Sequence, residues 1–469
     1  MTRWLSLLGV IALAGCSTCE TPSYFRQPDS TEEWNTNYLL DADPNTVSVA
    51  DLVSRAATLD QRYWQYSQVD GVVWQALRSD ASLAEPDRYS TGGDSALFTG
   101  QALAAFSFEY GVTRSTAALQ HVRESLRGLY ILTHSSGTPG VVQRNAFPAA
   151  TAELVGFEHW GRNPLFVHTG PAFPDPFGGP TIPSHVYYTR GTKDQLTGLV
   201  LGLAAVWSVT DPSRVDPAQT AEVAQIRAVA KQTAEDIYAH LKAYDWWIRD
   251  ENGANDTNAD YVDQILRACV LGLIVHMGDA GLQVEYDETY ADFIDLSNTL
   301  AYGDQFNNYQ QYYGHNLRAS RALAIWLLEG PDSPKGQQIA TYVSNNLWRF
   351  TQGHKNAWFA FIRGVTAPED GAAIAEGVYS LKSLSLKPTR LWSSPYHGQE
   401  HTPNIAEALV CHRNFVLDPH LRKPAGYSTW QKEPWDVGSE MDWDKEGLFE
   451  MSGIDYLLAY WLARYRGLF

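Results

Sequence analysis

Two kinds of helical segment alternate along most of the chain. One kind is apolar on nearly every side, as in a helix enclosed by other helices, and the other is amphipathic and charged, as in a helix with one wet face. The nearly apolar segments are residues 97–108, 196–207, 265–275, 317–328 and 454–464. The amphipathic segments are residues 49–66, 114–133, 218–243, 287–302 and 334–351. This alternation predicts an all-α fold in which inner and outer helices follow one another in turn.

Polar residues stand directly before the apolar segments. Thr192 and Gln195 fit a capping box, which places Asp194 in the first turn of its helix, where the helix dipole favours a carboxylate. Asp94 precedes a Thr-Gly pair and an aliphatic run in the same way. The corresponding positions before later segments hold Asp260, Asp263, His315, Asn316 and Asp455. We therefore expect the starts of several inner helices to surround one depression.

Two long stretches, residues 135–184 and 391–435, show little helical pattern. Structureless stretches of this length inside a compact domain are usually functional loops. The first contains Arg144 and Trp160, and the second contains Trp435. We expect their aromatic side chains to cover a cleft. Short hairpins could lie within residues 135–184 or 387–433.

Composition narrows the choice of partner. The formal net charge is −18, and the sequence contains no cluster of Lys and Arg. We therefore do not expect the protein to bind nucleic acid. The chain holds 16 Trp, 25 Tyr and 17 Phe. Aromatic side chains fill any core, but Trp and Tyr also offer flat faces on which sugar rings stack. Both interpretations stay open for each aromatic residue.

The N-terminus predicts export. Arg3 precedes an apolar segment that ends in Leu13-Ala14-Gly15-Cys16. This resembles a bacterial lipoprotein signal, which implies cleavage before Cys16 and lipidation of that cysteine. The alternative is an ordinary secretory peptide without an anchor. Ser17 after the cysteine implies the bacterial outer membrane, with the body facing the periplasm or the cell surface. No later segment reaches the roughly 20 apolar residues of a membrane span.

Three further cysteines remain. Cys19 lies in a Ser-, Thr- and Pro-rich segment that is typical of a tether, whereas Cys269 and Cys411 lie in helical patterns. A disulfide between Cys269 and Cys411 is permitted in an exported protein, but the pattern favours two buried free thiols. The spacings do not indicate a zinc site.

Several motifs together resemble a known group of proteins. They are SALFTGQALAAFSFEYGVT, GTPGVVQRNAFP, GTKDQLTGLVLGL and HNLRASRALAIWLLEG followed by HKNAWFAFI. This pattern is similar to that of bacterial six-hairpin glycosidase-like proteins, whose fold is an (α/α)6 toroid. The N-terminal pattern predicts a signal peptide at 1–15 and a lipidated tether at 16–45. The resemblance spans roughly residues 94–469 and implies one toroid domain, at 46–469. It implies a fold and not a reaction.

Glycoside hydrolysis is the first interpretation of the chemistry. It requires a carboxylic acid that protonates the leaving oxygen and a carboxylate that acts as base or nucleophile. Asp194 is the first candidate for one role, and Asp94 and Asp263 compete for the other. Glu109 lies four turns beyond Asp94 on the same predicted helix, so we expect it at the opposite end.

A polysaccharide lyase is the second interpretation. Cleavage of a uronic-acid polymer requires neutralisation of the carboxylate, a base for the α-proton and a donor for the leaving oxygen. Residues of these types stand close together at Tyr313, His315, Asn316 and Arg318. His315 and Arg318 would share a helix face, and Arg144 and Arg190 could hold an acidic sugar. His315 could instead be a structural residue at a helix start.

The complete expectation is a monomeric, lipid-anchored, glycan-active protein. The candidate catalytic residues are Asp194, Asp94, Asp263 and His315; the candidate substrate-binding residues are Arg144, Arg190, Trp160, Tyr313, Asn316, Arg318, Trp358 and Trp435. No cofactor or metal is expected. The oxygen-rich segment 245–260 lacks EF-hand spacing and favours a solvated turn over a calcium loop. A protein that binds glycan without cutting it is the third interpretation.

Overall fold

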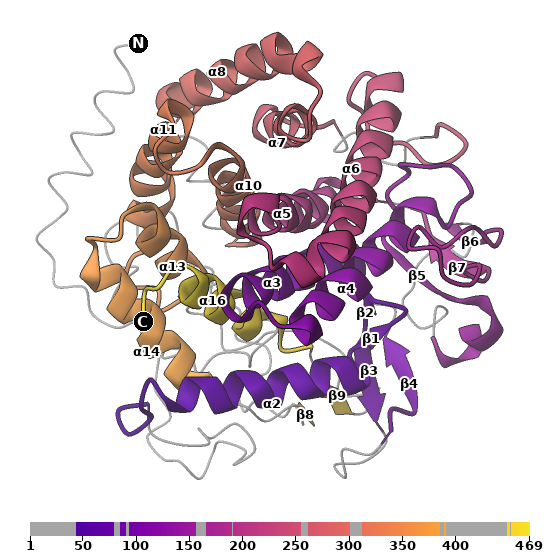
Figure 1. Ribbon diagram of the computed structural model, residues 1–469, viewed down its shortest axis with the longest axis horizontal. Coiled ribbons are helices and arrows are strands. Elements are labelled where there is room, and N and C mark those ends of the chain that lie inside the picture. Colours follow the sequence, from indigo (N-terminus) through magenta and orange to yellow (C-terminus); the bar gives the residue numbers. More distant parts are fainter. Residues whose placement is uncertain are drawn as a thin grey trace, which may run out of the picture.

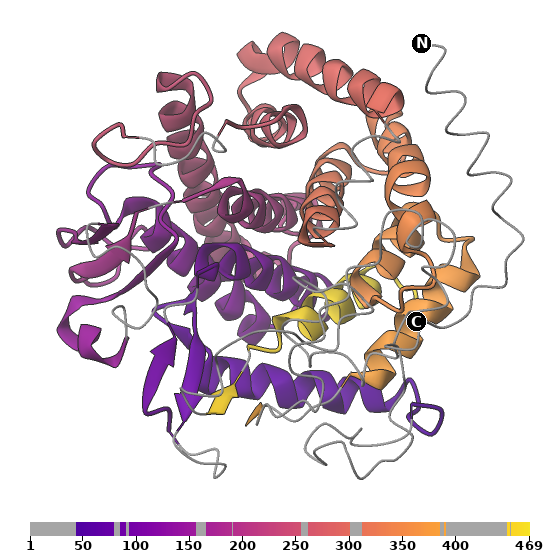
Figure 2. The same cartoon turned by 180° about the vertical axis from the view of Figure 1, so that it is seen from behind.

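The computed structural model of the protein is dominated by helices. It describes residues 44–78, 85–90, 93–155, 166–189, 191–254, 261–300, 312–384, 389–390, 448–450 and 452–469. The inner helices are α3 (Ser95–Thr113), α5 (Lys193–Val209), α7 (Gln264–His276), α10 (Tyr312–Glu329), α13 (Ala357–Thr366) and α16 (Ile454–Tyr465). The outer helices are α2 (Asp51–Tyr66), α4 (Thr116–His134), α6 (Thr220–Ala243), α8 (Gln283–Leu300), α11 (Pro334–Tyr342) and α14 (Gly371–Ser383). Figures 1 and 2 show the outer helices running around the inner ones.

The packing of these helices closes a ring. Going round it, α3 packs on α5, α7 packs on both α5 and α10, α10 meets α13, α13 packs on α16, and α16 returns to α3. Helices α5 and α10 also pack directly against each other. Each inner helix packs against the outer helix that follows it in the chain, and α16 packs against α2 at the other end of the sequence. The described residues therefore form an all-α (α/α)6 toroid.

The closest approach in the ring is the crossing of α3 and α5. Gly100 and Gly198 face each other there, and a Cβ atom added to either one would overlap backbone atoms of the other helix. Both glycines follow a threonine, Thr99 and Thr197, whose hydroxyl donates to the carbonyl one turn earlier. The repeated Thr-Gly pair thus allows two buried helices to touch through their backbones.

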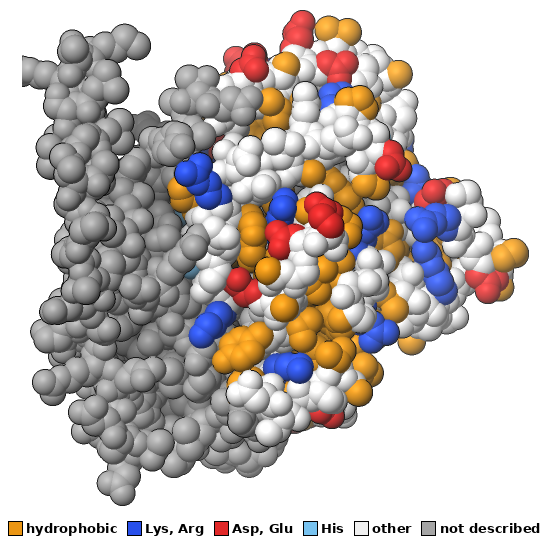
Figure 3. Space-filling view, turned by 90° about the vertical axis from the view of Figure 1, so that its left-hand side faces the viewer, with side chains coloured by type: hydrophobic (Ala, Val, Ile, Leu, Met, Phe, Trp, Pro, Cys, Tyr) orange, Lys and Arg blue, Asp and Glu red, His pale blue; other side chains and the backbone are white. Residues whose placement is uncertain are grey.

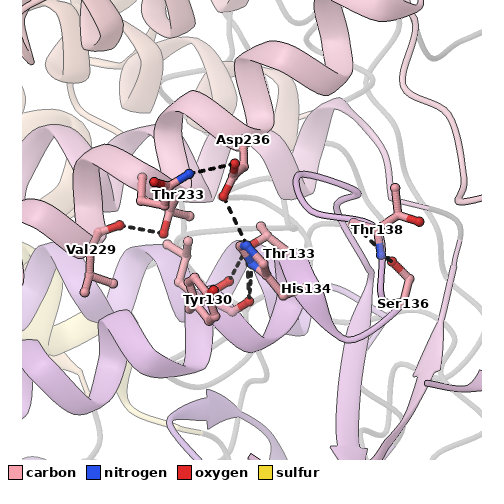
Figure 4. Close-up of polar contacts among 10 residues, drawn as sticks. Tyr130, Thr133, His134, Ser136, Thr138, Val229, Thr233 and Asp236 are labelled. Atoms are coloured by element: carbon pink, nitrogen blue, oxygen red, sulfur yellow. Dashed lines mark hydrogen bonds and ion pairs between the residues drawn. The ribbon is translucent and has the colours of Figure 1, made fainter. Parts of the chain in front are cut away.

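A buried histidine joins the outer helices α4 and α6 (Figure 4). His134, the last residue of α4, places Nε2 3.1 Å from Oδ2 of Asp236 in α6. The Tyr130 ring stacks on the imidazole with centroids 3.7 Å apart. The other carboxylate oxygen of Asp236 accepts from Gln232 at 2.9 Å. These contacts fix the register between two neighbouring outer helices.

Short strands connect the helices. The strands are β1 (Gln68–Val69), β2 (Val72–Val73), β3 (Gln75–Arg78), β4 (Arg88–Ser90), β5 (Asn145–Pro148), β6 (Val167–Thr169), β7 (His185–Tyr188), β8 (Thr389–Arg390) and β9 (Leu448–Glu450). They form a β1-β2 hairpin and two antiparallel sheets with the orders β4-β3-β9-β8 and β5-β7-β6. The second sheet matters for the site, because β7 leads directly into α5 and β5 follows Arg144.

Every helical segment predicted from the alternation is present, within a few residues of its expected ends. Two helices, α13 and α14, were not predicted by the alternation. The segment 334–351 is helical throughout but passes through a π-helical stretch at Val343–Trp348. The stretch 135–184 contains strands β5 and β6, but these do not form a hairpin with each other, because both pair with β7, which begins just beyond the stretch.

The face seen in Figure 3 carries mixed charge. Lys and Arg side chains are interspersed there with Asp and Glu, and exposed hydrophobic side chains lie between them. Among the described helices, none combines the length and the apolar character that a membrane crossing requires.

Candidate active site

Helix starts bring together the three aspartates that the sequence analysis singled out. Asp94 is the N-cap residue of α3, Asp194 lies in the first turn of α5, and Asp263 is the N-cap residue of α7. The capping box predicted for α5 is confirmed, since Thr192 N donates to Gln195 Oε1 at 2.9 Å. The candidate site is built on these three starts and on the first turns of α10.

Asp94 is held by two donors from different elements. The side-chain oxygen of Gln195, Oε1, completes the capping box of α5. Its side-chain nitrogen, Nε2, donates a hydrogen bond to Asp94 Oδ1 at 2.7 Å. Arg144 Nη2 donates to the same oxygen at 3.2 Å, and its Nε donates to the carbonyl of Gly93. The backbone N–H of Arg144 donates to Tyr188 O at 2.9 Å, which ties this clamp to the strand that leads into α5. Asp94 is therefore fixed relative to the start of α5.

Asp194 has a different environment. Its side chain is half-buried, and within the described part of the chain no hydrogen bond or ion pair engages its carboxylate. Burial raises the pKa of Asp194, and the negative charge of Asp94 raises it further, against opposing contributions from Arg321, Arg144 and Lys193. The position at a helix start favours the ionised form, but desolvation outweighs it. Asp194 thus keeps its proton to a higher pH than an ordinary aspartate does.

Asp263 has the opposite bias. Its Oδ1 accepts from Leu266 N at 3.1 Å, and its Oδ2 accepts from Arg321 Nη1 at 2.8 Å. Burial opposes ionisation of Asp263, but the Arg321 charge, the Leu266 N–H and the Lys193 charge outweigh it and lower its pKa. Arg321 also donates through Nε to Thr197 Oγ1 at 2.8 Å. Asp263 is thus an ionised carboxylate in a structural pair that joins α7, α10 and α5.

Tyr313 and Phe98 add an apolar wall to this site. Both are half-buried and pack against Leu97 and Leu317 where α3 and α10 meet. Burial raises the pKa of the Tyr313 phenol, and the Asp194 charge raises it further. Tyr313 therefore stays a neutral phenol close to Asp194, able to donate a hydrogen bond but poorly suited to accept a proton.

The remaining candidates lie in several places. His315 and Asn316 are buried, with 2% and 1% of their surface exposed. Burial lowers the pKa of His315 to about 3, and the Arg318 charge contributes to this shift. Trp358, in the first turns of α13, is buried, and Arg318 is half-buried. Arg190, Trp160, Trp435 and Cys16 lie outside the described residues. Cys269 is a buried free thiol, whereas Cys411 lies outside the described residues.

Two basic residues of the site were missed by the sequence analysis. Lys193 directly precedes Asp194, and Arg321 stands in the nearly apolar segment of α10 with only 5% of its side chain exposed. An arginine inside an apolar helix requires a buried partner. That signal was present in the sequence, but it does not identify Asp263 as the partner.

The three aspartates do not come together as a set of metal ligands among the residues that the structure describes. In the oxygen-rich segment, Asp250 Oδ1 accepts from the backbone N–H groups of Asn252 and Ala254, both at 2.8 Å. Its described part, up to residue 254, is a turn of the kind expected, and residues 255–260 lie outside the description.

Comparison with known proteins adds little. No protein-family model matches the sequence, and no curated protein matches it either. Among solved structures, the chain is similar to the crystal structure of a metagenome-derived glycoside hydrolase family 9 endoglucanase, with 12% identity and a TM-score of 0.42, over 89% of this chain and 80% of that one. We base no conclusion on a likeness of this size.

The pKa of Asp194 predicts a stability effect that can be measured. Because its native pKa is raised, the native state keeps this proton to a higher pH than the unfolded state does, and stability falls as pH rises through the raised value. Asp194→Asn should therefore unfold at a higher temperature than the wild type at pH 7, and the difference should vanish in acid. Thermal unfolding of both proteins across pH tests this. A variant that is less stable at pH 7 would mean that the carboxylate stabilises the fold.

Proposed function

We propose that the protein is a glycan-active hydrolase in which Asp194 is the proton donor and Asp94 is the partner carboxylate. The observation that carries the proposal is the pairing of a half-buried Asp194, whose pKa is raised, with the charge of Asp94 at the starts of two touching inner helices. A carboxyl group with a raised pKa beside a second carboxylate is the arrangement that acid–base hydrolysis of a glycosidic bond uses.

Asp94 is preferred to Asp263 as the partner for an electrostatic reason. Asp94 is the carboxylate whose charge raises the pKa of Asp194 most, so it lies near that acid. Both oxygens of Asp263 are also engaged, by Arg321 and by the Leu266 N–H. We assign Asp263 and Arg321 to the support of the site.

The proposed reaction uses these groups directly. Asp194 gives its proton to the leaving glycosidic oxygen as the bond between that oxygen and the anomeric carbon breaks. Asp94 either takes a proton from the attacking water or attacks the carbon itself. Gln195 and Arg144 keep Asp94 in place during this step. The neighbouring Tyr313 and Phe98 rings offer faces on which a sugar ring can stack.

A lyase has less support from the same residues. Its base would have to be Tyr313 or His315, but the Tyr313 pKa is raised and His315 is buried. Two arginines near Asp194, Arg144 and Arg321, are already paired with Asp94 and Asp263. A free uronate would have to displace one of these carboxylates.

The experiment that tests the proposed function uses the full chain and a panel of neutral and uronic-acid polysaccharides. New reducing ends and absorbance near 235 nm are followed together, because β-elimination creates an unsaturated, absorbing product and hydrolysis does not. We expect reducing ends without absorbance. A rise in both would establish a lyase, and binding without either signal would establish a protein that holds glycan without cutting it.

We further propose that the protein works outside the cell on a lipid anchor at the outer membrane. The support is the N-terminal pattern ending at Cys16. Fatty-acid labelling of the full chain in cells should be lost in Cys16→Ala, and labelling that persists would contradict the anchor.

A further inference from the structure

A second group of ionisable side chains lies at the other end of the toroid. Asp60 of α2, Glu109 of α3 and His121 of α4 place one potential ligand atom each within 4.8 Å of one another. Glu109 is fifteen residues beyond Asp94 on the same helix, which corresponds to roughly 22 Å along the helix axis. This Asp60–Glu109–His121 cluster is therefore separate from the candidate active site, and it is the only such group in the described part of the chain.

The three side chains are partly buried. The side chains of His121 and Glu109 are 22% and 13% exposed, and His121 Nδ1 lies 3.0 Å from Glu109 Oε2. Asp60 Oδ1 is buried without a hydrogen-bond partner. The Trp64 indole, one turn along α2, approaches the Asp60 carboxylate, but its Nε1 does not reach hydrogen-bond geometry. A buried carboxylate oxygen in this state lacks the donor or cation that it normally has.

The two carboxylates of the cluster share one basic group, the His121 imidazole. Glu109 repels the Asp60 charge, whereas His121 favours it. Elsewhere in the described chain, two carboxylates share an arginine, as Asp70 and Asp175 share Arg127. Two carboxylates that face each other at this separation require a proton or a cation between them.

The imidazole is held in one orientation. Its ring stacks on Trp64 with centroids 4.4 Å apart and meets the edge of Phe106 at 5.3 Å. This packing keeps Nδ1 directed at Glu109, so a ligand nitrogen and a carboxylate are already aligned.

We propose that Asp60, Glu109 and His121 bind a first-row divalent cation, with Zn²⁺ as the best match. One imidazole nitrogen and two carboxylate oxygens are common zinc ligands, and water would complete the coordination. The ion would join the first outer helix, α2, to the α3–α4 hairpin. Because α2 packs on the C-terminal helix α16, such a bond would stabilise the closure of the ring. Sequence spacing gives no sign of this site, since the ligands come from three helices.

The test titrates Zn²⁺ into the full chain, without a histidine tag and after treatment with a chelator. Calorimetry should show one equivalent of Zn²⁺ per chain, and the melting temperature should rise as Zn²⁺ is added. Asp60→Asn and Glu109→Gln should each weaken binding by at least the roughly 10–100-fold that loss of an outer-shell partner costs. Both variants also remove the repulsion between the carboxylates, so we expect the metal-free variants to melt no lower than the metal-free wild type.

Asp236→Asn is the matched control. Asp236 is also a carboxylate paired with a histidine between outer helices (Figure 4), but no second carboxylate joins that pair in the described chain. The Asp236→Asn variant should bind Zn²⁺ with the same affinity as the wild type. Absence of binding to the wild type, or equal binding by Asp60→Asn and Glu109→Gln, would overturn the proposal.

Discussion

Replacing Asp194 with Asn should lower turnover about 10²- to 10⁴-fold while the protein stays folded, because this is the usual contribution of a general acid. Asn has the shape of Asp but cannot supply a proton to the leaving oxygen. The raised pKa of Asp194 shows that the folded protein disfavours its charge, so the variant should not lose stability at neutral pH. Initial rates on the best substrate of the panel measure the effect.

Asp51→Asn is the control for that experiment. Asp51 also lies in the first turn of a helix, but it is exposed on outer helix α2 and accepts from Ser48 N and Oγ. It should keep the wild-type rate. Turnover of Asp194→Asn within about tenfold of the wild type would exclude the proton-donor role.

Gly198→Ala should be one of the most destabilising single-methyl additions in the chain. Its new Cβ would overlap the backbone of α3 at Leu97, and a backbone segment in a packed helix cannot move aside as a side chain can. We expect a loss of about 2–3 kcal/mol in the free energy of unfolding, at the upper end of the usual cost of overpacking. Denaturant unfolding measures it.

Gly371→Ala provides the comparison for this effect. Gly371 begins α14, and a Cβ atom there would meet nothing within 4 Å. That variant should be unchanged or slightly more stable, because alanine restricts the unfolded chain. Equal stability of Gly198→Ala and the wild type would show that α3 and α5 can separate without cost.

Much of the helical framework could be predicted because its signals are local. The capping box at Thr192 and Gln195 depends on residues three apart, and the apolar character of α5 follows from its own side chains. The alternation of enclosed and amphipathic helices then leads to the toroid. The strands escaped prediction because they have at most four residues each, too few for an alternating pattern to be recognised.

The chemistry of the site could be predicted only in part. Sequence indicated that Asp94, Asp194 and Asp263 begin inner helices, and the structure confirms those positions. It did not indicate that Arg321 pairs with Asp263 while Asp194 has no such partner among the described residues. That difference arises from contacts between helices that are distant in sequence. Because of it, the pKa of Asp263 is lowered and the pKa of Asp194 is raised.

The helix dipole illustrates the same limit. From sequence, the first-turn position of Asp194 favours an ionised carboxylate. In the folded protein, burial and the nearby Asp94 charge reverse that preference. The sequence pattern predicted the position of Asp194 correctly, but the helix-dipole argument predicted the wrong direction for its pKa shift. The reason is that desolvation depends on the whole fold.

The most direct measurement of the central claim compares wild type and Asp194→Asn on two substrates with the same sugar but different leaving groups. A poor leaving group, such as another sugar, needs a proton to depart, whereas a nitrophenolate does not. The account predicts a large loss of rate for the sugar leaving group and a much smaller one for the nitrophenolate. Equal losses for both substrates would contradict the assignment of Asp194 as the proton donor.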